Sequence, residues 1–187
     1  GDARRTEINV VGEDLSMEDL IADEEVMVTL SHEGYAKAQT LDTYRAQKRG
    51  GRGKAATNMK EEDFIEKLFI ASMHDTLLCF SSRGLIYKLK VYQLPMAGRA
   101  SRGKPMVNLL PLEEGERINA VLPIREYAED KYILMATSQG TVKKTALVEF
   151  ANLKNKGIKA INLRDGDKLV DVALTNGDND VMLFSTT

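Results

Sequence analysis

The chain has 187 residues, enough for one domain with a buried core. It is 43% hydrophobic and 29% charged, which is ordinary for a soluble folded protein and argues against a disordered one. No apolar run approaches the roughly 20 residues of a membrane-spanning helix, and the opening GDARRTEINV is not a signal peptide. Cys79 is the single cysteine, which excludes an intrachain disulfide, and its apolar neighbours predict a buried thiol in a reducing cytoplasm.

The formal net charge of −2 hides a strong segregation of charge along the chain. Acidic blocks cover residues 1–33 (−8), 61–75 (−4), 113–131 (−3) and 165–187 (−4). Basic blocks cover residues 43–60 (+6), 76–112 (+6) and 137–164 (+5). Blocks that alternate in this way form one basic face if they recur at the same place in a repeated unit, and such a face favours a nucleic-acid partner.

The first 24 residues are acidic and lie outside any repeat, so we predict a lead-in segment in which LSMEDLI is a short helix or an extended stretch. A unit of about fifty residues then recurs, with predicted boundaries at 25–74, 75–130 and 131–180 and the opening of a fourth unit at 181–187. Its turn glycines, Gly34, Gly84 and Gly140, are spaced by 50 and 56 residues, and its loop glycines, Gly53, Gly103 and Gly157, by 50 and 54.

Each unit has the same predicted order: an apolar strand, a tight turn, a strand, a basic glycine loop, a strand, an acidic turn and a last strand. The turn tetrads SHEG, SSRG and TSQG place glycine where a hairpin needs a residue with positive φ. In GLIYKLKV, alternation predicts Leu85, Tyr87, Leu89 and Val91 on one face and Ile86, Lys88 and Lys90 on the other. EEDFIEKLFIAS also has helical character, but its place in the repeat predicts a strand in its second half.

Four short strands in a repeat of this length predict an all-β fold of propeller-like blades. WD40 and kelch repeats are the generic competitors, but the chain has no tryptophan and no WD pattern. The predicted architecture is about three blades of four antiparallel strands plus the opening strand of a fourth.

One basic loop carries a specific resemblance. QKRGGRG at residues 47–53 resembles the basic-glycine box of the C-terminal domain family of the DNA gyrase A subunit. The flanking DLIADEEVMVTLSHEGY and EEDFIEKL, and CFSSRGLIYKLKVYQLP and NLLPLEEGERI in the second unit, resemble the same family. GDARRTEI resembles the end of the coiled-coil region that precedes this domain.

The resemblance implies a six-bladed β-pinwheel, in which neighbouring blades exchange strands and DNA wraps around a basic rim. Residues 25–187 would form about half of such a ring, and 1–24 the lead-in from the preceding region. We expect the apolar segment Val181–Ser185 to be exchanged into the third blade rather than to form a free edge.

The predicted DNA contacts are the box and the two loops that recur after it. They are Gln47, Lys48, Arg49, Gly50, Gly51, Arg52, Gly53 and Lys54 in the first unit, Arg99, Arg102 and Lys104 in the second, and Lys154, Lys156 and Lys159 in the third. Lysine and arginine supply charge for phosphates, and glycines allow close approach of the backbone. None of these residue types in this pattern reads one particular base, so we expect contacts to the DNA backbone and bending of the duplex.

We expect no catalytic residue, metal site or cofactor in the chain itself. The family's nucleophilic tyrosine follows an arginine, and no tyrosine here does. GGRGK lacks the first glycine and the Ser/Thr of a phosphate loop, and the Asp165–Asp167 and Asp178–Asp180 pairs are more typical of turns. The resemblance implies a holoenzyme that uses ATP and Mg²⁺, contains the gyrase B protein with a second copy of the A protein, binds double-stranded DNA and not membranes, and lies in the cytoplasm with the nucleoid.

Two other functions remain open. The equivalent domain of topoisomerase IV also binds DNA but lacks an intact box, so residues 47–53 discriminate against it. A protein-interaction propeller would carry aromatic and apolar anchors on its loops, whereas these loops carry lysine, arginine and glycine.

Overall fold

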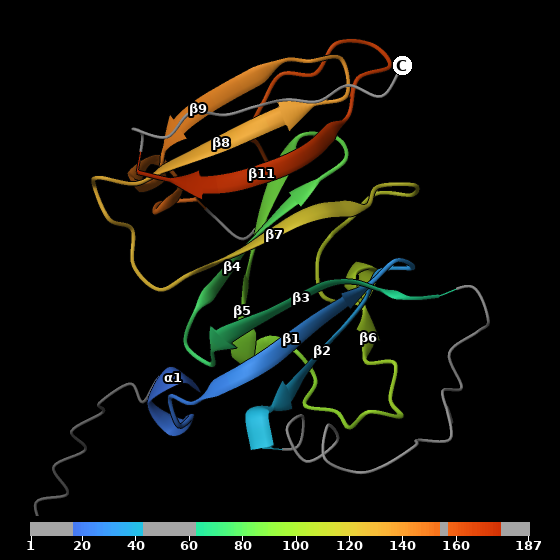
Figure 1. Cartoon of the computed structure of the whole chain (residues 1–187), viewed down its shortest axis with the longest axis vertical. Helices are drawn as coiled ribbons and strands as arrows, with labels where there is room; N and C mark the ends of the chain where they lie inside the picture. Colours follow the sequence, from blue (N-terminus) through green and yellow to red (C-terminus); the bar gives the residue numbers. More distant parts are fainter. Residues whose placement is uncertain (1–16, 43–62, 154–156, 177–187) are drawn as a thin grey trace, which may run out of the picture.

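Antiparallel β-sheet dominates the structure, a computed structural model that describes residues 17–42, 63–153 and 157–176. Three sheets are stacked one above another, with the third at the top of Figure 1 and the first at the bottom. A single-turn helix, α1 (Met17–Leu20), precedes the first sheet, as one of the two alternatives for the lead-in predicts.

Each sheet contains a hairpin and a closing strand from one repeat. The first sheet has the order β3 (Ile65–Ser72), β1 (Glu25–Ser31), β2 (Tyr35–Thr40), β6 (Lys104–Pro105). The second has the order β10 (Ile158–Lys159), β5 (Leu85–Lys90), β4 (Thr76–Ser81), β7 (Ile118–Ile124). The third has the order β11 (Leu169–Thr175), β8 (Tyr132–Thr137), β9 (Val142–Ala146). The closing strand of the first repeat is β3, which confirms that EEDFIEKLFIAS is extended in its second half.

Neighbouring blades exchange strands. β6 belongs to the basic loop of the second repeat, yet it pairs with β2 of the first sheet, Lys104 opposite Ala36. β10 belongs to the loop of the third repeat and pairs with β5 of the second sheet, Ile158 opposite Ile86. The exchanged element in both described cases is therefore the two-residue strand of the basic loop. The predicted exchange of Val181–Ser185 lies outside the described residues.

Glycine makes the exchange sterically possible. Gly103 has φ +83°, and a Cβ atom there would lie 2.2 Å from the carbonyl oxygen of Ala36 in β2. At the equivalent position in the next loop, a Cβ on Gly157 would lie 2.7 Å from the ring of Tyr87 in β5. These two loop glycines thus serve contact between blades, whereas close approach to phosphate is expected of the box glycines Gly50, Gly51 and Gly53, which lie outside the described residues.

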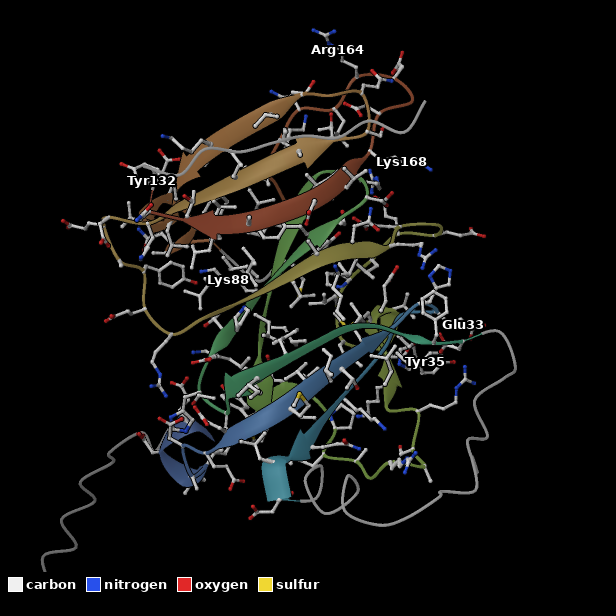
Figure 2. All side chains as sticks on the ribbon, viewed as in Figure 1. Glu33, Tyr35, Lys88, Tyr132, Arg164 and Lys168 are labelled. Atoms are coloured by element: carbon white, nitrogen blue, oxygen red, sulfur yellow. The ribbon has the colours of Figure 1, made fainter. Side chains whose placement is uncertain are left out.

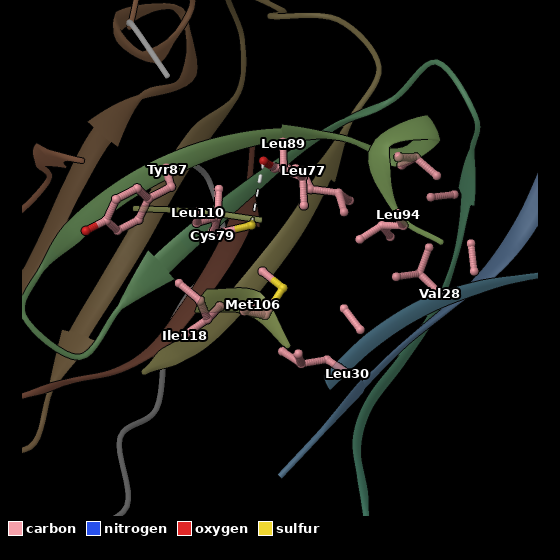
Figure 3. Packing of buried hydrophobic residues seen from close by; sticks show 14 of the residues in the cluster. Val28, Leu30, Leu77, Cys79, Tyr87, Leu89, Leu94, Met106, Leu110 and Ile118 are labelled. Atoms are coloured by element: carbon pink, nitrogen blue, oxygen red, sulfur yellow. Dashed lines mark hydrogen bonds between the residues drawn. The ribbon is translucent and has the colours of Figure 1, made fainter. Parts of the chain in front are cut away.

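Alternating side chains build two cores, one on each side of the second sheet. In β4, Leu77 and Cys79 join the cluster between the first and second sheets (Figure 3), whereas Leu78 and Phe80 join the cluster between the second and third. Full burial of side chains of this size stabilises a fold by about 1.5–3 kcal/mol each. Burial also raises the pKa of the Cys79 thiol to about 12, so the cysteine is protonated at neutral pH, as its predicted core role requires.

The alternation predicted for GLIYKLKV is confirmed. Tyr87, Leu89 and Val91 are buried in the first cluster, and Ile86 is buried in the second. The hairpin glycines also confirm the predicted turns, since Gly34, Gly84 and Gly140 have φ of +89°, +75° and +86°. Period-two patterning and turn glycines therefore specify the local structure of each blade.

An acidic residue before the closing strand of each blade ties that strand to the hairpin. Asp63 accepts from the backbone N–H of Glu33 at 3.0 Å, and Asp167 accepts from the N–H of Gln139 at 3.0 Å. Glu116 occupies the same place in the second repeat, where it accepts a hydrogen bond from the Tyr87 hydroxyl at 2.8 Å. These three carboxylates are thus structural, and each is held within its own blade.

The outward face of the first sheet carries apolar side chains that remain about half exposed. Ile65, Leu68 and Ile70 of β3 have relative exposures of 52%, 47% and 53%. Blades of a propeller bury apolar faces against both neighbours, and this face has no neighbouring sheet among the described residues.

We expect Gly103→Ala to destabilise the fold by at least about 1–2 kcal/mol, because alanine disfavours a left-handed backbone and its Cβ would meet β2. Gly98→Ala is the matched control in the same loop, since nothing lies within 4 Å of a Cβ there, and it should shift stability within about ±0.5 kcal/mol. Urea unfolding of both variants measures the difference. Equal stability of the two variants would contradict the assigned role of Gly103.

Candidate nucleic-acid interface

The basic loop of the second repeat lies along the exposed edge of β2. Two backbone hydrogen bonds begin the contact: the N–H of Ala38 donates to the carbonyl of Pro95, and the N–H of Ala97 donates to the carbonyl of Ala38, both at 3.0 Å. The chain then turns and returns antiparallel as β6. The loop is therefore fixed at both ends to the blade that precedes it.

Lys37 of β2 holds the turn of this loop from beneath. Its ammonium donates to the carbonyl oxygens of Gly98 at 3.0 Å, Arg99 at 3.3 Å and Ser101 at 2.8 Å. The side chain is largely buried, and this burial lowers the pKa of Lys37. Since the three carbonyls point inward at Lys37, the loop is organised by a cation of the neighbouring blade.

Two of the three cations predicted in this loop are exposed. Arg99 lies in the turn over Lys37, and Lys104 lies in β6 at the edge of the first sheet. Both side chains are accessible to a phosphate, and the backbone that carries them is held by the contacts just described.

Arg102, the third predicted cation, is engaged within the protein. Its guanidinium donates to Glu33 at 2.9 Å and lies 3.9 Å from Asp63. It also stacks on Tyr35, 4.2 Å from the ring centroid. Glu33 and Tyr35 lie together at the right of Figure 2, at the hairpin of the first blade. These contacts make Arg102 a link between the exchanged loop and that hairpin, while its contact with DNA stays a prediction.

The third loop repeats this arrangement only in part. Lys159 is exposed in β10 at the edge of the second sheet. However, Lys159 pairs with Leu85, whereas Lys104 pairs with the residue one place further along its hairpin strand, Ala36. A shift of one residue places a side chain on the opposite face of a strand. The lysines of the two loops therefore point to different sides of the sheet edge.

Several predicted contacts lie outside the described residues. They are the whole box from Gln47 to Lys54 and, in the third loop, Lys154 and Lys156.

The candidate residues predicted from the sequence do not include the lysines on the hairpin strands. Lys37 organises a loop, and Lys88 and Lys90 line a recess between the second and third repeats. The signal that could have identified the latter pair is the alternation of GLIYKLKV, which places Lys88 and Lys90 on one face of β5.

The described residues contain no group of three or more His, Cys, Asp or Glu side chains that could hold a metal ion. Asp167 confirms its predicted place in a turn. Burial works to raise the pKa of its carboxyl, but hydrogen bonds from Thr137, Gln139, Ser138 and Lys168 outweigh this and lower it. Asp178 and Asp180 lie outside the described residues.

Comparison with known families matches the three repeats. The family described as DNA gyrase C-terminal domain, beta-propeller, matches residues 25–72, 75–125 and 131–176. The chain belongs to this family. The matched segments begin and end within a few residues of the three predicted repeats, and each contains one described hairpin with its closing strand.

Sequence relatives of this family member are gyrase A subunits. The chain is 61% identical over 186 residues to the DNA gyrase A subunit of Haemophilus influenzae and 58% identical over 185 residues to that of Escherichia coli. The matches cover 100% and 99% of the chain but 21% of each relative, so the chain spans about a fifth of their length.

Solved structures share the fold. A crystal structure of the C-terminal domain of DNA topoisomerase IV superposes with a TM-score of 0.70 at 31% identity, over 84% of this chain and 47% of that one. A structure of the DNA gyrase A C-terminal domain gives 0.63 at 22% identity, over 81% and 48%. Pinwheel domains of gyrase and topoisomerase IV therefore share this architecture, and the sequence relatives distinguish between them.

We expect Arg102→Ala to lower the free energy of unfolding by about 1 kcal/mol, the scale of one cation–π contact with a partly exposed ion pair. Arg99→Ala is the matched control from the same loop, and its cost should stay within about ±0.5 kcal/mol. Urea unfolding at low salt measures both. An equal cost for the two variants would show that Arg102 does not link the loop to the hairpin.

Proposed function

We propose that the chain is the DNA-binding and DNA-wrapping module of a bacterial type IIA topoisomerase, DNA gyrase, and that it enables ATP-dependent negative supercoiling. The observation that carries this proposal is the placement of the basic loops. Two of them occupy equivalent edges of neighbouring sheets, and each is fixed there by a strand exchanged into the preceding blade. Cations at equivalent edges of stacked blades can follow one DNA backbone along its length.

The exposed cations suit phosphate rather than bases. Arg99, Lys104 and Lys159 lie on edge loops, and their spacing along the stack depends on the blades and not on any base sequence. Phosphate contacts position a protein on DNA without reading sequence. Smooth bending of 20–30 base pairs costs of order 1–6 kcal/mol, which several such contacts can offset.

The box from Gln47 to Lys54 takes part in this proposal as the first of the repeated DNA contacts, together with Lys154 and Lys156 of the third loop. Its cations and glycines fit a phosphodiester in the way argued from the sequence. In the second loop, Arg102 contributes mainly by holding its loop in place.

The complete protein, rather than this chain, would carry out the supercoiling reaction. We propose that the gyrase B protein and a second copy of the A protein join it, that ATP and Mg²⁺ act in those other parts, and that the DNA-cleaving tyrosine lies elsewhere in the A protein. This chain would then be non-catalytic, and it would work in the cytoplasm at the nucleoid. Among the described residues, no helix is long and apolar enough to cross a membrane.

The equivalent domain of topoisomerase IV is the second candidate, because a structure of that domain superposes with the higher of the two TM-scores given above. The intact box and the gyrase A relatives at 58–61% identity favour gyrase. A protein-interaction propeller fits less well, since the described loops present charge at the sheet edges.

A salt titration tests the proposed function. The logarithm of the association constant for linear duplex DNA should fall linearly with the logarithm of salt concentration, with a slope of about −0.9 for each phosphate neutralised. Fluorescence anisotropy with two duplexes of unrelated sequence should give the same slope and similar affinity. A salt-independent affinity, or a strong preference for one duplex, would refute backbone-directed binding.

A further inference from the structure

A polar recess of about 410 Å³ opens between the second blade and the third repeat. Lys88 and Lys90 of β5 line it, followed by Tyr92 and Gln93 in the 3₁₀ turn after that strand. Tyr127, from the connection between β7 and β8, also lines it, as do Thr76, Leu89, Ala151 and Leu153. Figure 2 shows Lys88 at the left of the molecule, opposite the hairpin that carries Glu33 and Tyr35.

The two lysines place two positive charges in this recess. Lys88 and Lys90 are two residues apart in a strand, so they project from the same face of β5. The Lys88 ammonium donates one hydrogen bond, to the carbonyl of Ala151 at 2.8 Å, and an ammonium has three N–H donors. It lies 5.3 Å from the centroid of the Tyr127 ring. Lys88 therefore retains donor capacity toward the recess.

An anion already compensates part of the positive charge of Lys90, whereas the described contacts of Lys88 include no anion. The Lys90 ammonium lies 2.7 Å from Glu18 of α1 and also donates to the carbonyl of His74 at 3.4 Å. The described contacts of Lys88 are a carbonyl and an aromatic ring, which are not anions. Burial, and then the charge of Lys90, lower the pKa of Lys88. Two like charges in a partly desolvated recess are stabilised by an anion placed between them.

At the corresponding place in the first blade, the described part of the loop lies directly against the strand. Ala38 stands where the second blade has Lys88, and its backbone binds Pro95 and Ala97 of the incoming loop. In the second blade the long side chain of Lys88 bridges to the third repeat instead. The substitution of lysine for alanine at this position thus coincides with an open, cationic site between two blades.

We propose that this recess binds a backbone phosphate of double-stranded DNA, with Lys88 as the principal contact, Lys90 beside it and the Tyr92 and Tyr127 side chains at its margin. The proposal rests on the proposed function and adds a DNA contact between blades to those on the basic loops. The recess is large enough for a phosphodiester group. Contacts from ammonium groups to a phosphodiester need positive charge and N–H donors, and they do not read a base.

The test compares three variants of this chain with the unsubstituted chain. Lys88→Gln removes the charge but keeps an N–H donor for Ala151, and Lys88→Arg restores the charge. Lys168→Gln is the matched control, because Lys168 is exposed and lies on the other side of the view in Figure 2. Anisotropy with a linear duplex is measured from 50 to 300 mM KCl. Thermal unfolding confirms that each variant is folded.

Lys88→Gln should weaken binding about fivefold at 150 mM salt and make the salt slope shallower by about 0.9, the contribution of one phosphate. Lys88→Arg and Lys168→Gln should retain the original slope. If the unsubstituted chain binds DNA and Lys88→Gln binds it equally well, the recess is not a DNA contact, while the proposed function stands. Equal losses in Lys88→Gln and Lys168→Gln would reflect net charge alone and would also overturn the proposal. A chain that does not bind DNA at all would remove both.

An NMR titration with inorganic phosphate separates a DNA contact from a site for free phosphate. Resonances around Lys88 that shift with millimolar phosphate, together with an unchanged DNA slope in Lys88→Gln, would assign the recess to a small anion and overturn the proposal. Shifts at Lys88 with duplex DNA that are lost in Lys88→Gln would support it.

Discussion

The contact between an exchanged loop and the neighbouring blade is the constraint on which the rest of this fold depends. Gly103 lets the loop of the second repeat close against Ala36, and Gly157 does the same for the third loop against Tyr87. Each contact completes a four-stranded sheet with a strand from the next repeat. Blades are therefore joined by backbone hydrogen bonds as well as by their cores, and the loops that carry the cations are part of that joint.

The same joint explains why the cations are well placed for a long polyanion. A basic loop that only connected two strands would be solvated and mobile. Here Lys37 binds three loop carbonyls, and Arg102 connects the loop to Glu33 and Tyr35. Arg99 is thereby presented from a fixed backbone. Lys37 and Arg102 thus hold the loop in place, and Arg99 is exposed on it.

Acidic residues occupy different places from the exposed cations. The chain has a net charge of −2, which by itself argues against a DNA partner. Asp63, Glu116 and Asp167 are held within the blades by hydrogen bonds to hairpin N–H groups or to a tyrosine hydroxyl. The groups that these carboxylates bind compensate part of their charge, and Asp63 also lies 3.9 Å from the Arg102 guanidinium. Net charge is a poor guide to partners when the two signs occupy different places in a repeat.

Much of this fold was predictable from the sequence because its signals are local. The turn glycines and the two faces of GLIYKLKV depend on neighbours within a few residues, and the structure agrees with both. The partners of Arg102 and Lys37 were not predictable, because they come from another repeat. The one-residue offset between Lys104 and Lys159 could have been read from the sequence, since Lys104 follows Gly103 directly whereas Ile158 separates Lys159 from Gly157, and the strand register relative to these glycines is the same.

The central claim is that DNA is bent along cations set by the blades, without regard to base sequence. The most direct measurement is energy transfer between dyes at the two ends of a short duplex as this chain is added. The account predicts that transfer increases on binding and reaches the same value for two duplexes of unrelated sequence. Binding without an increase in transfer, or an increase confined to one of the two sequences, would contradict it.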